Sequence, residues 1–472
     1  MNFFSLFVFQ ILILFNIINF TKNKSSLIIK FETQYPSKLT PDNFFETKFK
    51  NEPKIIIKAG THRQSIPCYL NLNTPTIYIS GSNSSLAKSQ VKYDEKKSQK
   101  YKNTSNTITS ESFYVYGMPS IDEICINDKE IFQLKFYLAQ TKFSSNELSY
   151  SCVLGLGYEE LIYDDEDTEP YSEGIESFLT QIKNNKIIDK KLFFINYNSN
   201  NDYDDNGELI FGNYPHEIKE NNEKYCEACN EEDYIEINNI INEIEVIWSV
   251  KGFIYMGEKL IFNYLASIEF EVTQGFIIGS YNYKTNILNE FFNEKLSNNE
   301  CFENEIFMQN KAFNGYYCKK NVDISIIESL ILIIDKIKYK IEFTYDDLFT
   351  ENDGYLYFNV LFTQDEDPFK NDFILGKPFF KKYPIVFYTN GRGENIGFYN
   401  NLFFKKKERV NPYNNNKDYK KGNILTILLI FIGIVIIGLL VYIIYRYFKR
   451  PRKQKVNELI EFFDYSSVQK KI

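Results

Sequence analysis

The sequence of 472 residues has only two histidines, one tryptophan and four methionines. Histidine is the side chain that most often serves as a general base near neutral pH and as a metal ligand. We interpret His62 and His216 as solvated loop residues rather than as a base or a ligand. The sequence also lacks a Walker loop, a Rossmann fingerprint and an HExxH motif. These absences argue against nucleotide and zinc-peptidase chemistry, and we expect neither a cofactor nor a metal.

A stripe of positive charge is also missing. The net charge is −8, and acidic runs occur at residues 164–167 and 202–205. Proteins that bind nucleic acids neutralise phosphates with clustered lysine and arginine. We therefore expect no nucleic-acid partner.

Two apolar runs lie near the ends of the chain. Residues 3–20 are typical of a secretory signal, and we assign residues 1–21 to a signal peptide. A second run carries no charge, is long enough to span a membrane as a helix and is followed by basic residues. We predict a single-pass type I membrane protein of the secretory or endolysosomal pathway or of the cell surface. The predicted segments are a stalk at 401–423, one C-terminal transmembrane helix at 424–445 and a cytosolic tail at 446–472.

Seven cysteines in a chain with a secretory signal favour disulfides, and the odd count leaves at least one unpaired. Cys226 and Cys229 are close enough in sequence to form a small local disulfide. A zinc site would need a second such pair, which the sequence lacks. Asn83 and Asn103 lie in Asn-x-Ser/Thr sequons, and we predict that they are glycosylated if this part of the chain is luminal or extracellular.

Two distant segments, 60–79 and 268–280, share one pattern. Each has an apolar strand, a short polar interruption and a second apolar strand. This pattern presents polar side chains in a loop between two buried strands. Two such loops suit a cleft that binds a ligand.

The two segments resemble the active-site segments of the pepsin-like aspartic proteases, in which an Asp-Thr-Gly motif occurs once in each half of the chain. Gly60 and Gln64 match the turn that precedes the first motif. Counting on from this turn places Asn71 at the first catalytic aspartate. Aligning the apolar run 276–278 places Glu271 at the second. Both catalytic aspartates are therefore predicted to be substituted.

Further resemblances keep the family's order along the chain. They are the flap strand at 114–117, the apolar-apolar-Gly motif at 153–158, the next helix at 177–182, a strand at 207–212, Trp248 at the start of the second lobe, and the closing motif at 373–398. The resemblance implies an all-β, two-lobed pepsin-like fold with a central cleft. The implied lobes are an N-terminal lobe at 51–220 and a C-terminal lobe at 240–400.

The resemblance also implies a Cys301–Cys318 disulfide across a loop of the second lobe. Cys68 and Cys152, which flank the first active-site loop, are compatible with a disulfide or with two buried thiols.

The same resemblance places Thr74 in the first active-site loop and Tyr116 on the flap, both beside the cleft. Only residues 118–121 separate the flap strand from the next strand, where the family usually has a longer tip. We therefore predict a short flap.

Aspartic proteolysis requires two carboxylates that share one proton, so that one activates a water molecule and the other protonates the scissile carbonyl. Asn71 has no proton affinity at working pH, and Glu271 is longer than aspartate by one methylene. The family's next two positions, Thr and Gly, also differ: here they are Leu72 with Asn73 and Val272 with Thr273.

The sequence therefore predicts an aspartic-protease-like type I membrane protein without proteolytic activity, whose partner is an extended peptide or a protein. Two alternatives remain. One is an active aspartic endopeptidase with an Asn71–Glu271 dyad, which predicts acid-optimal cleavage dependent on Glu271. The other is a structural or adhesive ectodomain whose cleft is filled, which predicts a cleft blocked by Leu72, Asn73 and the short flap.

Overall fold

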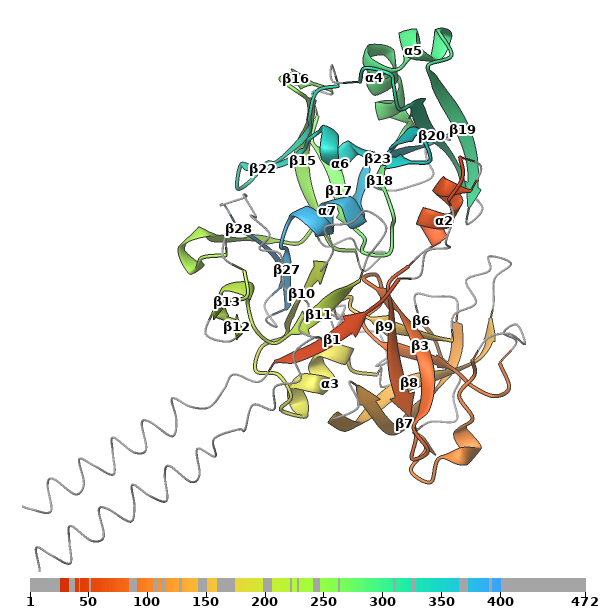
Figure 1. The fold of residues 1–472 in the computed structure, drawn as a ribbon. Coiled ribbons are helices and arrows are strands. Elements are labelled where there is room, and N and C mark those ends of the chain that lie inside the picture. The colour runs from red at the N-terminus through yellow and green to blue at the C-terminus, as the bar shows by residue number, and fades with distance from the viewer. Residues whose placement is uncertain are drawn as a thin grey trace, which may run out of the picture. The chain divides into compact units, whose positions relative to one another are not determined.

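The computed structural model describes most residues between 26 and 399, and these form three β-sheets and a two-stranded ribbon (Figure 1). The residues it leaves undescribed within this range are 34–38, 42, 51, 85–90, 105–108, 112–114, 127–129, 143–150, 159–174, 198–205, 221–222, 227–228, 241–246, 262–263, 309–310, 325–326, 365–371 and 390–392. The predicted signal peptide, stalk, transmembrane helix and tail lie outside the described residues. Among the described helices, none is both long and apolar enough to cross a membrane.

The first lobe is built on an eight-stranded sheet of described residues in the order β2-β3-β9-β4-β8-β7-β5, with β6 beside β7. The strands are β2 (Lys54–Ala59), β3 (Gln64–Asn71), β4 (Ile77–Ser80), β5 (Lys102–Asn103), β6 (Thr109–Glu111), β7 (Val115–Ile126), β8 (Glu130–Lys142) and β9 (Cys152–Gly155). In β3, buried Ile66, Cys68 and Leu70 alternate with more exposed residues. This period of two is what a strand with one buried face requires.

The second lobe is built on a sheet whose described strands follow the order β22-β21-β15-β17-β26-β18-β25-β20-β24-β23, with β16 beside β15 and β19 beside β20. The strands are β15 (Ser249–Met256), β16 (Lys259–Leu260), β17 (Ala266–Phe270), β18 (Ile277–Gly279), β19 (Cys301–Met308), β20 (Lys311–Lys319), β21 (Leu330–Ile334), β22 (Tyr339–Phe343), β23 (Phe349–Asn352), β24 (Tyr355–Phe358), β25 (Val360–Thr363) and β26 (Phe373–Leu375). The central strands are buried on both faces, because β17, β18, β25 and β26 consist entirely of buried residues.

A six-stranded sheet joins the two halves of the chain in the order β1-β11-β10-β27-β28-β14. Its strands are β1 (Leu27–Phe31), β10 (Leu192–Tyr197), β11 (Gly207–Phe211), β14 (Tyr234–Asn238), β27 (Val386–Thr389) and β28 (Glu394–Tyr399); β12 (Lys219–Glu220) and β13 (Glu223–Lys224) form the separate ribbon. β1 precedes residue 51, where the first lobe was predicted to begin, and it pairs along its whole length with β11. The prediction of an all-β pepsin-like fold is confirmed.

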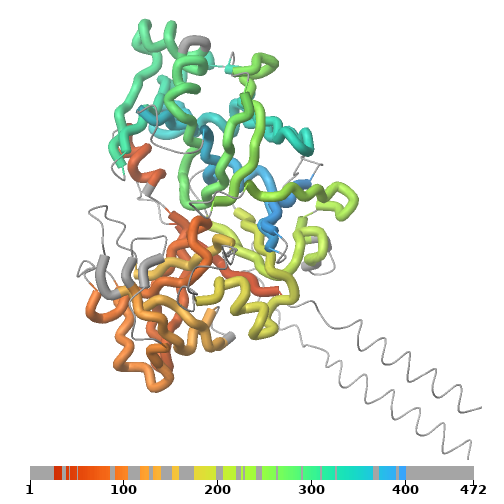
Figure 2. The backbone as a smooth tube through the Cα atoms, turned by 180° about the vertical axis from the view of Figure 1, so that it is seen from behind, coloured from red at the N-terminus to blue at the C-terminus, as the bar shows by residue number. Residues whose placement is uncertain are grey.

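Short helices accompany these sheets. They are α2 (Phe44–Lys50), α3 (Phe178–Asn184), α4 (Tyr281–Phe291), α5 (Asn293–Ser297), α6 (Tyr345–Leu348) and α7 (Lys377–Lys382). α2 lies beside β19 of the second lobe, although the strand that follows it, β2, belongs to the first-lobe sheet (Figures 1 and 2). The segment that contains α2 therefore crosses from one lobe to the other.

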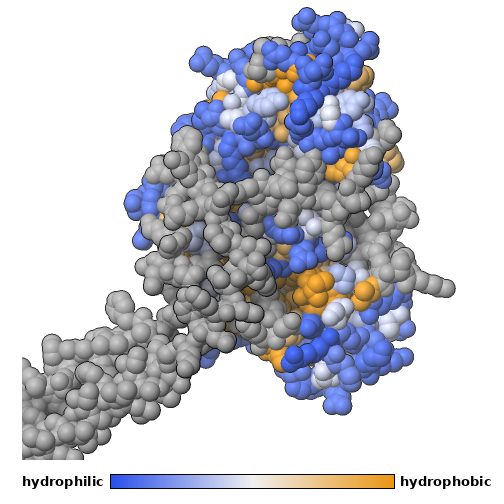
Figure 3. Space-filling model, in the orientation of Figure 1, coloured by the Kyte–Doolittle hydropathy of each residue, from blue (hydrophilic) through white to orange (hydrophobic). Residues whose placement is uncertain are grey.

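The main hydrophobic core contains buried side chains of both lobes. Trp248, which is fully buried, donates a hydrogen bond from Nε1 to the carbonyl of Leu156 at 3.3 Å and packs edge-on against Tyr158. The sole tryptophan of the chain thus joins the start of the second lobe to the loop after β9. On the face drawn in Figure 3, the described residues are mainly hydrophilic, with a few apolar areas.

Candidate active site

The two loops that carry Asn71 and Glu271 have the same construction. Asn71 ends β3, and the loop after it leads into β4. β9 pairs parallel with β3 and antiparallel with β4. In the second lobe, Glu271 follows β17, the loop leads into β18, and β26 pairs parallel with β17 and antiparallel with β18. The structure therefore places both sequence-predicted positions at equivalent points of two similar lobes.

A glycine at the end of the third strand lets each loop close. A Cβ atom on Gly155 would lie 2.3 Å from the carbonyl oxygen of Thr76 and 2.4 Å from that of Thr74. A Cβ atom on Gly376 would lie 2.3 Å from the carbonyl oxygens of both Gln274 and Phe276. Such a close approach of two backbones is open only to glycine.

Asn71 and Glu271 are connected through Asn73. The Oδ1 atom of Asn71 accepts a hydrogen bond from the backbone N–H of Asn73 at 2.7 Å. The Nδ2 group of Asn73 donates across the two lobes to Oε2 of Glu271 at 3.2 Å. The Oε1 atom of Glu271 accepts from the N–H and the hydroxyl of Thr273, at 3.1 and 2.8 Å. The former dyad is thus a hydrogen-bonded bridge in which the amide of Asn73 contacts the single carboxylate.

Glu271 is buried, with only 5% of its surface exposed. Burial raises the pKa of its carboxyl group to about 7, against an ordinary value of 4.5. The hydrogen bonds that Thr273 donates lower this pKa, and the charge of Glu52 raises it. At neutral pH the side chain is therefore close to its midpoint of protonation, without the second carboxylate that the protease mechanism needs.

Asn73 can also hold the protonated form of Glu271. Its Oδ1 atom is buried and has no hydrogen-bond partner among the described residues. The orientation of an asparagine amide is assigned from its surroundings, and a turn of 180° exchanges Oδ1 with Nδ2. In the turned orientation Oδ1 accepts the proton of neutral Glu271. The amide of Asn73 can therefore hydrogen-bond to the Glu271 carboxyl group in either of its protonation states.

The residues beside the dyad positions are apolar where the family has hydroxyl groups. Leu72 and Val272 are fully buried members of the main core. Thr74 is also fully buried, and its hydroxyl oxygen has no hydrogen-bond partner among the described residues. Its carbonyl accepts from the N–H of Gly157 at 2.7 Å, which fixes the loop to the chain after β9. Thr74 thus holds the Asn71 loop in place through its buried backbone carbonyl.

The strand of the predicted flap runs without a break. β7 extends over Val115–Ile126 and pairs along its length with β8, with one irregularity between Tyr116 and Gly117. The backbone of Tyr116 also pairs with Ser110 of β6. Because the strand is continuous, no hairpin tip lies between Gly117 and Asp122, and the prediction of a short flap with its tip at 118–121 is wrong. The side chain of Tyr116 lies outside the part of the structure that is described.

α2 packs directly behind the Glu271 loop. A Cβ atom on Gly275 would lie 2.3 Å from the carbonyl oxygen of Lys48, so α2 and this loop are in backbone contact. Glu52, two residues beyond α2, is buried and acts electrostatically on Glu271. This contact was not predicted from the sequence. The available signal was the spacing of Phe44, Phe45 and Phe49, which places three aromatic side chains on one face of a helix.

The structure pairs six of the seven cysteines. The disulfides are Cys68–Cys152, Cys226–Cys229 and Cys301–Cys318, and Cys125 is buried as a free thiol. The first joins β3 to β9 directly beside the Asn71 loop, which resolves the alternative left open for this pair. The Cys301–Cys318 disulfide joins β19 to β20, as the resemblance implied.

Other candidate residues lie away from this site. Asn83, in a turn, and Asn103, in β5, are exposed. His62 is exposed, but His216 is half-buried, because its Nδ1 atom is 2.8 Å from the hydroxyl of Tyr399 and its ring stacks on Tyr214. The interpretation of His216 as a solvated loop residue is therefore wrong. Within the described ranges, no group of three His, Cys, Asp or Glu side chains is arranged to hold a metal ion.

Comparison with known proteins identifies the family of the chain. No curated protein sequence matches the chain. The family model described as eukaryotic aspartyl protease matches residues 56–399, which include both dyad loops and all three sheets except β1 and the first two residues of β2. With this match over most of its length, and with two equivalent loops meeting at Asn73 and Glu271, the chain belongs to the eukaryotic aspartyl protease family.

Proposed function

We propose that this aspartyl protease homologue is a pseudoprotease that binds an extended peptide or a protein. The observation that supports the proposal is the bridge between Asn71, Asn73 and Glu271, which replaces two carboxylates by two amides and one buried acid. A peptide backbone can pair with a protein without any catalytic acid.

The chemistry of the bridge explains why hydrolysis is not expected. A water molecule needs a base that removes its proton while a second group protonates the scissile carbonyl. Both oxygens of Glu271 already accept hydrogen bonds, from Asn73 and Thr273. An amide at position 71 takes up no proton in the acid range. The two dyad positions therefore supply one titratable acid, where the mechanism needs one group to accept the proton of water and a second to protonate the carbonyl.

The test is an acid-range proteolysis assay of the full-length chain on a mixed peptide library, at roughly pH 3 to 7. We expect no cleavage by the wild type, by Glu271→Ala or by Asn71→Asp. Asn71→Asp restores one acid but leaves Glu271 misplaced by about an ångström, a displacement that can cost on the order of 100-fold in rate. Cleavage by the wild type that disappears in Glu271→Ala would establish an active peptidase and overturn the proposal.

A second candidate function is a structural or adhesive ectodomain whose cleft is filled. The observation that favours it is the contact of α2 with the Glu271 loop, together with the burial of Glu271. The two candidates differ in whether α2 can be replaced by another segment. An α2 that never leaves its position favours the structural role.

We also propose that the β-rich unit is luminal or extracellular and is anchored by the apolar segment 424–445, as the signal-like start and the basic residues after this segment suggest. Three disulfides are consistent with an oxidising compartment.

Glycosylation tests this topology. We expect the chain expressed in eukaryotic cells to shift in mobility after glycosidase treatment, because Asn83 and Asn103 are exposed and lie in sequons. The shift should decrease in the double variant Asn83→Gln/Asn103→Gln and disappear when Asn23, in a further sequon after the predicted signal peptide, is also replaced by glutamine. Asn298→Gln, at an exposed asparagine outside any sequon, is the matched control and should keep the shift. A wild-type chain without glycan would place these residues on the cytosolic side.

A further inference from the structure

One face of α2 is aromatic and buried. Phe44, Phe45 and Phe49 are at most 4% exposed, whereas Glu46, on the opposite face, is exposed. A helix of seven residues is not stable alone in water. The packing of this face therefore maintains the helix.

The surface under α2 belongs entirely to the second lobe, and we call it the aromatic face. Its buried members are Phe276, Ile278, Ile306, Met308, Phe313, Tyr357, Leu361 and Ile374. The ring of Phe44 stacks on Tyr357 with centroids 3.8 Å apart. Phe45 packs on Phe276 at 5.8 Å and Phe49 on Phe313 at 5.7 Å. Each phenylalanine of α2 therefore has its own aromatic partner.

Lys48 adds a polar contact to this apolar interface. Its side chain is buried, and Nζ donates to Oδ1 of Asn359 at 2.9 Å and to the hydroxyl of Thr350 at 3.2 Å. Nζ also lies 5.4 Å from the ring centroid of Phe276 and 5.6 Å from that of Phe44, within the range of a cation–π interaction. A buried ammonium is costly unless such partners are in place. The aromatic face thus contains a built site for one cation.

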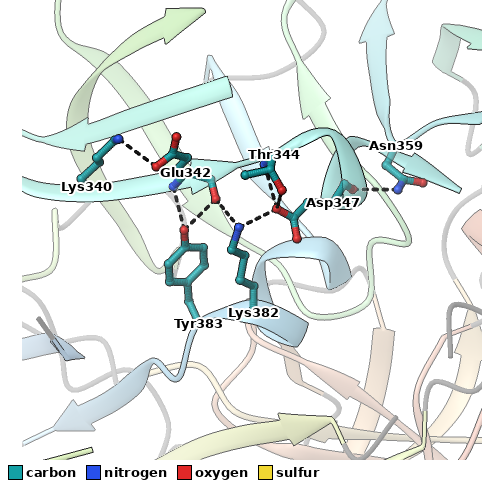
Figure 4. Close-up of polar contacts among 7 residues, drawn as sticks. All are labelled: Lys340, Glu342, Thr344, Asp347, Asn359, Lys382 and Tyr383. Carbon is teal, nitrogen blue, oxygen red and sulfur yellow. Dashed lines mark hydrogen bonds and ion pairs between the residues drawn. The ribbon is translucent and has the colours of Figure 1, made fainter. Parts of the chain in front are cut away.

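The acceptor of this site is held by the second lobe itself. The Nδ2 group of Asn359 donates to the carbonyl of Asp347 at 2.8 Å, and the Asp347 carboxylate pairs with Lys382 of α7 at 2.5 Å (Figure 4). Lys382 also donates to the carbonyl of Glu342 at 2.8 Å. The carbonyl of Asn359 accepts from the N–H of Ile277 at 3.0 Å, next to the Glu271 loop. None of these bonds involves α2, so Asn359 is positioned whether or not Lys48 is present.

The packing of α2 is also separable from the main core. Its three phenylalanines belong to the cluster of the aromatic face and to no other cluster of the described residues. Removing α2 would therefore leave the main core intact and expose the aromatic face together with Asn359 and Thr350. An α2 that leaves its place uncovers a complete receptor surface.

We infer that the aromatic face is the peptide-binding site of this protein and that α2 is its tethered ligand. The external ligand is a protein segment of the same chemistry: two adjacent aromatic residues, a lysine three positions after the second, and a further aromatic residue next to the lysine. This inference rests on the proposed function and selects the second of its two ligand classes, a protein segment rather than an extended peptide. The segment folds into a helix on the aromatic face as α2 does.

Because α2 is covalently joined to the chain, it competes strongly with an external ligand for the aromatic face. A segment joined by a short linker acts at an effective concentration in the millimolar range. An external ligand meets a free aromatic face only in the small fraction of molecules in which α2 has left, and its apparent affinity falls by that fraction. A chain whose α2 is weakened should therefore bind the ligand at least about 10-fold more tightly than the wild type.

The experiment measures fluorescence anisotropy of a labelled peptide with the sequence of residues 39–50, capped at both ends, with the full-length chain. The emptied variant is Phe44→Ser/Phe45→Ser, and Phe307→Ser, at a phenylalanine that is 74% exposed, is the matched control. We expect binding to the emptied variant at least about 10-fold tighter than to the wild type or to the control. A peptide with Lys48→Met should bind at least about 10-fold more weakly, because Asn359 and Thr350 lose their cation.

Circular dichroism and urea unfolding establish that the emptied variant is folded. If it is not, the chain with Lys48→Met, which keeps the three phenylalanines, is expected to bind the peptide more tightly than the wild type. No binding to a folded chain with weakened α2 would overturn the inference, as would equal binding of the native and the Lys48→Met peptides. Either result would leave the pseudoprotease proposal in place, because that proposal is decided by the cleavage assay.

Discussion

Replacing Glu271 by glutamine is expected to stabilise the fold by about 3 kcal/mol at pH 8 and to leave its stability nearly unchanged at pH 4. Burial raises the pKa of Glu271 from 4.5 to about 7 in the folded chain. Below pH 4.5 the carboxyl group is neutral in both the folded and the unfolded chain, so it imposes no penalty. Glutamine resembles this neutral form in shape.

The penalty develops as the pH rises. Between pH 4.5 and 7 the unfolded chain loses its proton while the folded chain keeps it, so the folded state binds more protons and the free energy of unfolding falls with increasing pH. Above pH 7 the folded chain carries a buried carboxylate and the full penalty applies. The glutamine variant should escape this loss. Glu271 therefore lowers the free energy of unfolding at neutral and alkaline pH but not in an acidic compartment.

Urea unfolding of the disulfide-intact chain at several pH values from 4 to 8 measures this difference. Asn73→Ser is the comparison variant, since it removes the bond from Nδ2 to Glu271 but keeps the titrating group. It should lower stability by about 1 to 2 kcal/mol at neutral pH and retain a dependence on pH. If the stability of Glu271→Gln fell with pH in parallel with the wild type, the carboxyl group would not titrate in this range.

Gly376→Ala is expected to destabilise the fold by about 3 kcal/mol. The new Cβ atom would lie 2.3 Å from the carbonyl oxygens of Gln274 and Phe276. Both are backbone atoms of the Glu271 loop, so neither can move without shifting that loop. The φ angle of Gly376 is −94°, which any residue can adopt, so the expected cost is steric.

Gly81→Ala is the matched control. Its nearest atoms are those of the flexible Leu138 side chain, at 3.0 to 3.3 Å. We expect a change below about 1 kcal/mol, because the side chain can yield and alanine also lowers the entropy of the unfolded chain. Thermal or urea unfolding of both variants provides the measurement. Equal effects of the two substitutions would show that the close approach of Gly376 to the loop does not limit stability.

Much of the fold could be predicted because the apolar patterns and short motifs follow one another along the chain in the order found in the family. The alternation of apolar residues before Asn71 and the apolar run 276–278 after Glu271 both indicate a strand beside a loop. The prediction that both aspartates are substituted likewise rests on position alone. The pairing of Cys68 with Cys152 could not, because it depends on β3 and β9 lying in parallel register across 84 residues.

The bridge at the candidate site depends on tertiary structure. From the sequence, Asn73 was a replacement for a glycine and a residue that could block the cleft, whereas in the structure its amide reaches a carboxylate 198 positions away. The partners of the Glu271 carboxylate likewise come from both lobes, Asn73 from the first and Thr273 from the second. No local pattern encodes such a contact, because it exists only once the two lobes have packed.

The family and the two equivalent loops follow from residue types at fixed spacing, so they could be recognised in the sequence without the structure. The helix that packs against the Glu271 loop is known from the folded structure alone. The tertiary structure docks α2 on the second lobe and places Lys48 on Asn359, 311 positions along the chain. The physical reason is that three phenylalanines and a lysine on a short helix have no stable conformation of their own, and the complementary surface that orders them assembles from strands distant in sequence.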